Sequence, residues 1–595
     1  MSLLLAILLF LATQQLSETI VVTASALPEK VGSTPASVTV ITKKQIDAQA
    51  ARDVADVLRE VPGLSVSRTG SLGKTTSVFV RGASSKQVLV LWNGVEINDP
   101  YFSGYNFGQF STVGVRRIEI ARGPFSSLYG ADAVGGVINI ITSGGSDHTD
   151  LDVSAGGRGL FNGIASLQQT FGATTLSLAA EHRQDNGFAL NDNDRRNSIV
   201  GALTFAPANT LSIGLTGRAS NYDLGVPRNT NDTATAYVAT PHHRESGSEW
   251  QLALPVTADF GAIHAELRLS ENRRDDRNED PDAQSFGATR STRQTIHLSA
   301  RRTTAIGTVV AGAEGEKAEA NNHDSFGLDL DTHHRSNNAV FVEDRFSRGP
   351  FELSAGARYD HYDSFGSETS PRIGAAWSLN GHKIHAAYGQ AFRAPQIGEL
   401  YLPFFGNPDL HAERSRSAEL GYDRFFGSDG VFSITAFRNT FRDLIIYDLA
   451  ANRFANVGLA RSRGVEVAAS DRRGPFTGSL TYTFLRAIEE SSGAPLPRRP
   501  KHSGSLELGY TRGAGSAELV VARVGSRADV NDLVPFDNVI NRAYTVADIT
   551  FRLNVRAFEP YAKIENLTNT RYQEVFGYPS PTRRALLGVR YTVSR

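Results

Sequence analysis

Two histidine pairs, His242-His243 and His333-His334, are the residues whose type first suggests metal or haem chemistry. Imidazole is a common metal ligand, but neighbouring side chains on an extended chain point to opposite faces and need not share one ion. Neither pair has a third ligand at metal-site spacing, and the chain contains no cysteine. We therefore expect solvated loop histidines rather than a metal or haem centre.

Sequence motifs for catalysis are absent as well. The chain has no nucleophile elbow, phosphate-binding loop or zinc-protease motif, so we expect no enzyme activity and no required cofactor. The 61 basic residues nearly balance the 62 acidic ones, which gives no electrostatic reason to expect nucleic-acid binding. A chain of 595 residues is too long for one ordinary core, and we expect two or more parts.

A short β-prone run near the N-terminus could bind a partner through the unpaired backbone hydrogen-bonding groups of a strand. Residues 18–24 read Glu-Thr-Ile-Val-Val-Thr-Ala, with three β-branched apolar residues in succession. Such a strand cannot bury itself and offers a free edge to a partner, with an ordinary first strand of a sheet as the alternative. Residues 1–17 contain an apolar stretch, Leu3 to Ala12, of signal-peptide length and too short to span a membrane. We expect export, with cleavage near Ala12.

Residues 25–147 predict a small mixed domain. Thr42 and Gln45 have capping-box spacing, which predicts that a helix starts there. Asn93-Gly94 is a hairpin-turn signal. A second helix is predicted from an apolar face formed by Val54, Val57, Leu58 and Val61. Four short strands are predicted at residues 78–81, 88–91, 117–120 and 137–141.

Residues 148–595 alternate between apolar and polar side chains, as in Leu587, Val589, Tyr591 and Val593. We expect strands of about ten residues, separated by polar loops such as 185–196, 226–245 and 272–282. A soluble sandwich is the alternative, but the charged face favours a closed barrel with lipid outside and a wet lumen. At about 20 residues per strand and connection, the region predicts an all-β membrane protein with roughly 22 antiparallel transmembrane strands.

Several motifs, in order, resemble those of the TonB-dependent outer-membrane receptors, and the resemblance covers nearly the whole mature chain. Residues 18–24 resemble the Ton box of that family. Five segments resemble successive motifs of its plug domain, and three resemble barrel signatures: 53–63, 78–82, 88–95, 118–124 and 129–141 in the first group, and 388–395, 406–410 and 564–572 in the second.

This resemblance implies a mixed α+β plug inside the barrel lumen and a place in the outer membrane of a Gram-negative-type bacterium. It implies three partners: TonB with its inner-membrane energising complex, outer-membrane lipid and a small-molecule ligand; we expect a monomer. The residues implied to bind TonB are Glu18, Thr19, Ile20, Val21, Val22, Thr23 and Ala24. Four charged plug residues could form ion pairs with charged residues of the barrel lumen, or could simply be solvated there: Arg81, Arg117, Glu119 and Arg122.

Within the family, the chain most resembles the cobalamin transporters, which makes cobalamin or a related corrinoid the first expected cargo. The substrate-facing plug loops of those transporters correspond to residues 71–77 and 98–103, and the implied ligand-binding residues are Lys74, Thr75, Thr76, Ser77, Asn98, Tyr101, Phe102 and Ser103. The resemblance also suggests calcium in extracellular loops, against the alternative of simple solvated acidic loops, at Asp185, Asp192, Asp194, Asp223 and Asp232.

Two alternatives remain open at this point, and a third, a receptor-transducer, is nearly excluded. A ferric siderophore or haem importer would share every motif above. A passive pore or adhesin would keep the barrel but need neither Ton box nor plug motifs. A receptor-transducer would need a signalling domain ahead of residue 18. One departure from the family is the final Arg595 in place of an aromatic residue, which puts the efficiency of barrel assembly in question.

Overall fold

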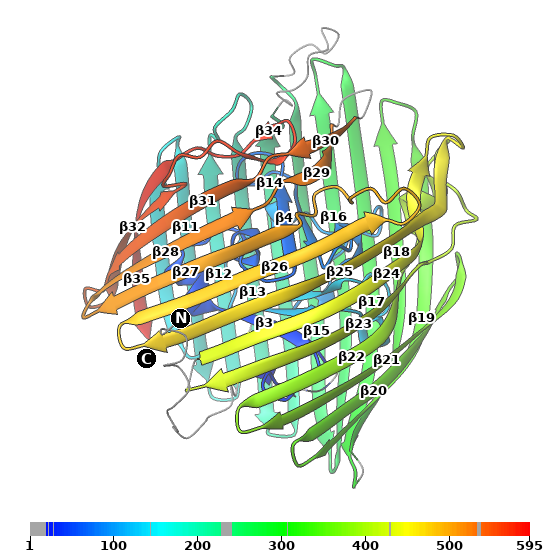
Figure 1. The fold of residues 1–595 in the computed structure, drawn as a ribbon, viewed down its shortest axis with the longest axis horizontal. Coiled ribbons are helices and arrows are strands. Elements are labelled where there is room, and N and C mark those ends of the chain that lie inside the picture. The colour runs from blue at the N-terminus through cyan, green and yellow to red at the C-terminus, as the bar shows by residue number, and fades with distance from the viewer. Residues whose placement is uncertain are drawn as a thin grey trace, which may run out of the picture.

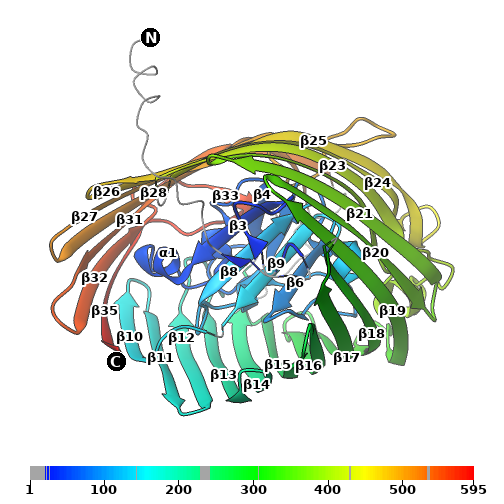
Figure 2. The ribbon, with the colours of Figure 1, turned by 90° about the horizontal axis from the view of Figure 1, so that it is seen from below.

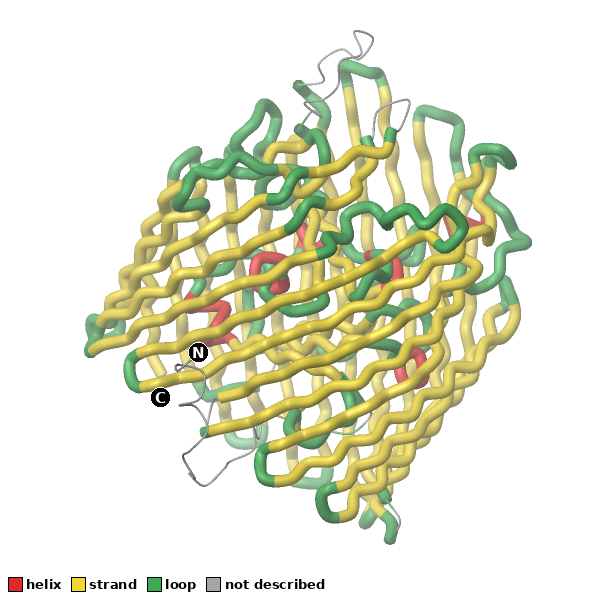
Figure 3. Tube along the Cα trace, viewed as in Figure 1, coloured by secondary structure: helices red, strands yellow, loops and turns green. Residues whose placement is uncertain are grey.

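The computed structural model describes residues 20–594 except 22, 26, 28, 143, 228–240, 306, 428–429 and 532–536. These residues form a closed barrel with a small mixed domain, the plug, inside its lumen (Figures 1 and 2). Strands dominate the molecule, and the few helices are short (Figure 3). No helix in this part of the chain has the length and hydropathy needed to cross a bilayer.

The barrel is antiparallel and has 22 strands within the described residues, which confirms the predicted fold class. The first strand closes on the last through nine register pairs, from His148↔Ser594 to Gly156↔Leu586. In barrel order the strands are β10 His148–Gly156, β11 Leu160–Phe171, β12 Thr174–Asp185, β13 Asp194–Ala208, β14 Leu211–Gly225, β15 Arg244–Phe260, β16 Ile263–Asp280, β17 Ser285–Thr303, β18 Thr308–Asp324, β19 Leu330–Arg348, β20 Phe351–Tyr362, β21 Gly366–Leu379, β22 His382–Arg393, β23 Glu413–Phe426, β24 Gly430–Asp448, β25 Arg453–Arg473, β26 Phe476–Glu489, β27 His502–Arg512, β28 Gly515–Val524, β31 Tyr544–Leu553, β32 Phe558–Glu565 and β35 Arg584–Ser594.

Alternation along each strand separates a polar inner face from an apolar outer face. In β23, Glu413, Ser415 and Glu419 are buried toward the lumen, whereas Leu420 points outward with 59% of its surface exposed. This arrangement is the reverse of a soluble protein's, and it suits a wall with hydrocarbon outside and polar contacts inside.

Many barrel strands are longer than the sequence-based expectation of about ten residues, which was wrong on this point. β25 has 21 residues, and residues 272–280, expected to lie in a loop, belong to β16. The charged side chains of that stretch are tolerated because they pair along the strand, as Arg273 does with Asp275 at 2.9 Å. Hairpins that continue into water therefore keep the strand pattern without an apolar face.

The plug is built on a five-stranded sheet in the order β3-β8-β9-β6-β7, in which only β6 and β9 run parallel. Apolar residues from this sheet and from helix α2 form its main core, including Val54, Leu58, Trp92, Ile118 and Ile138. The plug strands are β2 Glu29–Lys30, β3 Ser37–Thr42, β4 Leu64–Arg68, β5 Thr76–Val80, β6 Val88–Trp92, β7 Val95–Glu96, β8 Arg117–Arg122 and β9 Gly136–Ile141. Its helices are α1 Lys43–Ala48, α2 Val54–Leu58, η1 Ser85–Gln87, η2 Phe107–Gln109 and α3 Ser126–Tyr129.

Two local predictions for the plug are confirmed. Thr42 caps α1, accepting a bond from the backbone of Gln45 while the Gln45 side chain accepts one from the Thr42 backbone. The turn at Asn93-Gly94 joins β6 to β7, and both residues have positive φ, 49° and 79°, as a tight two-residue hairpin turn requires. The remaining short elements are β1 Ile20–Val21, α4 Ile397–Tyr401, β29 Arg527–Val530, β30 Asn538–Asn541, β33 Gln573–Val575 and β34 Tyr578–Pro579.

Candidate functional site

The two ends of the barrel differ in the length of their connections. At one end, the short-turn end, strands are joined by turns such as 172–173, 209–210 and 349–350. At the other, the long-loop end, connections include 394–412 and 566–583. Plug loop 98–103 reaches the long-loop end, where the carbonyl of Tyr101 accepts a hydrogen bond from Gly398 of α4 at 2.9 Å.

An aromatic cluster surrounds this plug loop, and it consists of Tyr101, Phe102, Phe405, Tyr447 and Phe454. The ring centroids of Tyr101 and Phe102 lie 4.5 Å apart, and those of Phe102 and Phe454 lie 6.0 Å apart. Tyr447 then contacts both Phe454, at 5.7 Å, and Phe405, at 5.6 Å. The plug loop, the α4 connection and the β24–β25 hairpin thus bring their rings together at one mouth of the barrel.

A cation and exposed apolar groups border the cluster. The Lys86 ammonium lies 5.3 Å from the centroid of the Phe102 ring, within cation–π range, and 3.2 Å from Glu399. Phe404 and Leu449 are close in sequence to cluster residues, and 80% and 79% of their surfaces are exposed. Aromatic faces with one adjacent cation suit a large ligand that carries planar rings and acidic oxygens.

The predicted ligand-binding residues divide into two groups. Phe102 and Ser103 are half-buried at the long-loop end, and Thr75 is exposed. Asn98, by contrast, is buried and bonds through its side chain to the backbone of Val90 and Val88. The sequence did not predict Phe405, Tyr447 or Phe454; the Phe404-Phe405 pair beside the 406–410 motif is the signal that could have found the first of them.

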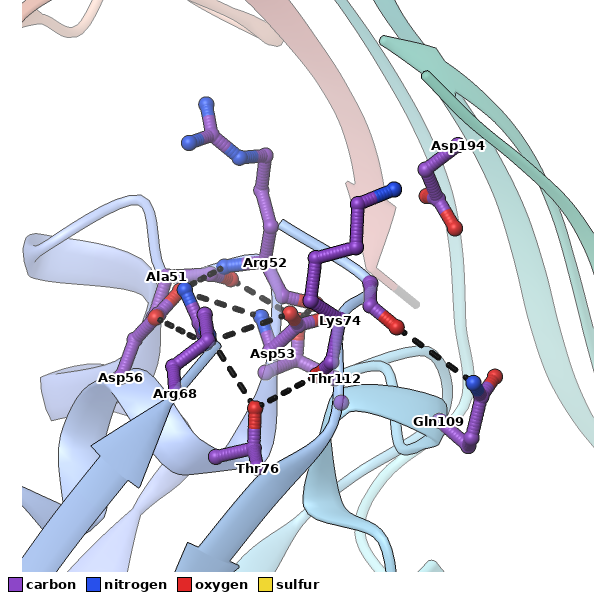
Figure 4. Close-up of polar contacts among 12 residues, drawn as sticks. Ala51, Arg52, Asp53, Asp56, Arg68, Lys74, Thr76, Gln109, Thr112 and Asp194 are labelled. Carbon is purple, nitrogen blue, oxygen red and sulfur yellow. Dashed lines mark hydrogen bonds and ion pairs between the residues drawn. The ribbon is translucent and has the colours of Figure 1, made fainter. Parts of the chain in front are cut away.

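Loop 71–77 is used mainly to attach the plug to the wall. The Lys74 ammonium donates to the carbonyl of Asn193 at 2.8 Å, and burial lowers the pKa of this lysine. Thr76 donates to the carbonyl of Lys74 and accepts from Arg68 (Figure 4). Ser77 is half-buried in β5. These polar groups satisfy one another in the packed lumen, so they are poor candidates for direct ligand contact.

Buried ion pairs fix the plug against the barrel. Arg183 of β12 donates to Asp53 at 2.6 Å and to Asp194 at 3.0 Å. Arg68 lies between Asp53 and Asp56 (Figure 4). Removing one partner of such a pair typically costs about 3–5 kcal/mol, because the other charge stays buried.

A second set of buried pairs involves the plug charges that the sequence singled out. Arg81 contacts Glu419 at 2.5 Å and Glu466 at 2.7 Å, and Arg122 contacts Glu466 at 3.3 Å. For these two arginines the paired alternative is correct. Arg117 and Glu119 instead pair with each other at 2.7 Å inside the plug.

The segment predicted to bind TonB lies at the plug edge, and Glu18, Thr19 and Val22 are outside the described residues. Its edge is not free, which corrects the expectation. Ile20 and Val21 pair with Lys30 and Glu29 in a two-stranded ladder, since an exposed edge takes the nearest available strand. Thr23 and Ala24 are buried.

The described aspartates that the resemblance implied for calcium all have other partners. Each carboxylate already accepts from a cation or from backbone N–H groups: Asp185 from Arg584 at 2.6 Å, Asp192 from Phe188 at 2.8 Å, Asp194 from Arg183 at 3.0 Å and Asp223 from Arg244 at 2.5 Å. Asp232 lies outside the described residues. In the described part of the chain, no group of three His, Cys, Asp or Glu residues is arranged to hold a metal ion.

Comparison with known proteins gives two family matches. Residues 30–137 match the model described as the TonB-dependent receptor plug domain, and residues 132–567 match the TonB-dependent receptor-like β-barrel.

Several solved structures share the fold at low sequence identity. The siderophore receptor PirA from Acinetobacter baumannii is 15% identical, with a TM-score of 0.78 over 93% of this chain and 98% of that one. The ferripyoverdine receptor of the Pseudomonas aeruginosa outer membrane, bound to ferripyoverdine, is 15% identical, with a TM-score of 0.80 over 97% and 89%. The P. aeruginosa ferric enterobactin receptor PfeA, a mutant in complex with enterobactin, is 17% identical, with a TM-score of 0.78 over 95% and 100%.

Proposed function

The chain belongs to the TonB-dependent receptors of the bacterial outer membrane, and we propose that it imports a ferric siderophore whose chelating groups carry aromatic rings. The family is one of transporters rather than enzymes. The observation that carries the proposal is the aromatic cluster around Phe102, with Lys86 beside it.

Two further points favour a siderophore over cobalamin, the cargo first expected from the sequence. Three of the five carboxylates that the resemblance implied for calcium, Asp185, Asp194 and Asp223, instead pair with Arg584, Arg183 and Arg244. The similar solved structures described above are siderophore receptors by name.

The proposed transport cycle uses both ends of the barrel. The ligand docks on the aromatic cluster at the long-loop end, which would face the outside of the cell. Residues 18–24 then join the sheet of TonB as an added strand at the short-turn end, through backbone hydrogen bonds. The ladder between β1 and β2 holds Ile20 and Val21 by only two register pairs, so breaking this ladder in favour of a TonB strand would cost little.

Ligand titration tests the proposal. Purified receptor is titrated with a ferric catecholate, a ferric hydroxamate and cyanocobalamin, with and without calcium. We expect the catecholate to bind tightest, and Phe102→Ala to weaken it roughly 3- to 10-fold, the usual range for one aromatic contact. Phe171→Ala is the matched control, because Phe171 is an exposed aromatic at the short-turn end. Tightest binding of cyanocobalamin, or equal effects of the two variants, would refute the proposed cargo.

A further inference from the structure

Strand β7, Val95–Glu96, is the weakest-held strand of the plug sheet. It lies at the sheet edge and pairs only with β6, through Leu91↔Glu96 and Trp92↔Val95. Its C-terminal end leads directly into loop 98–103, which carries Tyr101 and Phe102 of the aromatic cluster. Its N-terminal end is the Asn93-Gly94 turn.

Barrel side chains take the place of a strand on the open side of β7. Arg268 donates to the carbonyl of Gly94, Asn272 donates to that of Glu96 at 2.7 Å, and Arg293 donates to that of Asn98 at 3.0 Å. These are alternate carbonyls on one edge, the ones a neighbouring strand would use. The position of β7 is therefore set by β16 and β17 of the wall as much as by its own sheet.

One buried side chain links the β7 turn to the TonB-binding segment. The side-chain oxygen of Asn139, on β9, accepts from the backbone N–H of Gly94 at 3.1 Å. The amide nitrogen of the same side chain donates to the hydroxyl of Thr23 at 3.1 Å, and that hydroxyl donates to Glu119 at 2.7 Å. Asn139 is 3% exposed and Thr23 is fully buried, so these bonds are shielded from water.

A cavity beside these groups leaves room for them to move. It has a volume of about 580 Å³ between the plug and the wall, and Ser25, Leu27, Val95, Glu96 and Asn139 are among its lining residues. A shift of β7 or withdrawal of residues 23–27 would therefore not collide with packed side chains on this flank.

We propose that β7 transmits occupation of loop 98–103 to the TonB-binding segment, with Asn139 as the positioning residue between them. The inference rests on the proposed TonB-dependent import and names its internal connection. A ligand that draws loop 98–103 toward the barrel members of the aromatic cluster, Phe405, Tyr447 and Phe454, moves β7 along the wall. The Gly94 N–H then leaves Asn139, the Asn139 amide reorients, and Thr23 loses a hydrogen bond that keeps it in the plug.

The coupling can be measured without any ligand, because the native chain contains no cysteine. Ala24→Cys supplies a single thiol at a buried position of the TonB-binding segment, since Ala24 is 3% exposed. Its rate of reaction with a maleimide reports release of that segment. Arg293→Gln removes the hydrogen bond to Asn98 and the ion pair with Glu96 of β7 at 2.5 Å. We expect it to raise the labelling rate at least about 10-fold. Arg196→Gln is the matched control: Arg196 is also a buried wall arginine, but it donates to Gly108 and Gln109. We expect that control to change the rate less than twofold.

A double-mutant cycle separates transmission from general loosening. Thr23→Val should raise labelling by itself and should abolish the effect of Arg293→Gln, whereas Thr23→Ser, which keeps the hydroxyl, should preserve both behaviours. Additive effects in the Thr23→Val background, or equal effects of Arg293→Gln and Arg196→Gln, would overturn the proposal. If Arg293→Gln does not fold, as judged by heat-modifiable gel migration, Asn272→Ala carries the same test. Since no siderophore is involved, a wrong cargo leaves this result unaffected.

Discussion

Glu60 is a plug carboxyl that faces other carboxyls across the lumen. Its side chain accepts a hydrogen bond from Gln49 at 2.7 Å, but burial and the nearby Glu507 raise its pKa from 4.5 to about 8. The folded state therefore holds this proton more tightly than the unfolded state does. The contribution to stability is fully present below pH 4.5 and is lost as the pH rises toward about 8.

Glu60→Gln should therefore flatten the pH dependence of plug stability. The neutral amide mimics the protonated acid, so we expect the variant to gain about 1–2 kcal/mol over the native protein at pH 9 and little at pH 4. Trp92, the only tryptophan in the plug, reports its unfolding by fluorescence. Asp56→Asn is the opposing control: although burial raises the pKa of Asp56, Arg68 and other cations lower it to about 2, so this variant should destabilise the plug at pH 9. A larger gain at pH 4 than at pH 9 for Glu60→Gln would contradict the assignment.

The residues of the candidate site were only partly predictable from the sequence. Tyr101 and Phe102 could be placed at a loop tip because the flanking plug motifs fix the loop's position. Phe405 and Tyr447 could not, because they come from separate connections that meet only when the barrel closes. Lys74 and Asn98 have the side chains of ligand-binding residues, yet a plug inside a closed wall must satisfy its polar groups internally, and it uses these two for that purpose.

At the scale of elements, alternation predicted the faces of the barrel strands but not their ends. The period of two residues holds equally for strands in hydrocarbon and for hairpins that extend beyond it, as in β25. Charges such as Arg273 and Asp275 look like loop residues until the cross-strand ladder is known. Plug elements were easier to predict, because the Thr42 cap and the Asn93-Gly94 turn are local signals that depend on a few adjacent residues.

The short ladder between β1 and β2 gives a direct test of strand addition. Val21→Pro removes a backbone N–H and restricts φ in the segment that would join the TonB sheet. We expect TonB-dependent uptake of the bound chelate to fall to background, with ligand affinity unchanged within twofold, since the aromatic cluster is at the other end of the barrel. Val21→Thr, which keeps the N–H and β-branching, is the control and should retain uptake. Uptake by Val21→Pro at the native rate in energised cells would exclude recognition through this strand.

At the scale of the whole molecule, the plug also ties together the strands that close the barrel. Arg590 of β35 lies 2.9 Å from Asp152 of β10 and 2.9 Å from Asp47 of α1, which Figure 2 shows beside this part of the wall. Toward the long-loop end, Glu565 of β32 pairs with plug residue Arg52 at 2.5 Å and with Arg584 of β35 at 3.1 Å. The closing strand β35 is thus linked to the plug at two levels along the barrel axis.

This double link predicts that the plug contributes to barrel stability as well as closing its lumen. Asp47→Asn weakens the contact with Arg590 while Asp152 still neutralises that arginine, so we expect a loss of about 1–2 kcal/mol. The loss should appear as a lower temperature for the disappearance of the heat-modifiable barrel band. Lys43→Gln is the matched control, because it removes the other partner of Asp47, a lysine on the more exposed side of α1, and should cost less than about 0.5 kcal/mol. If both variants leave the barrel transition unchanged while plug fluorescence shifts, the plug and the closing strand are energetically independent.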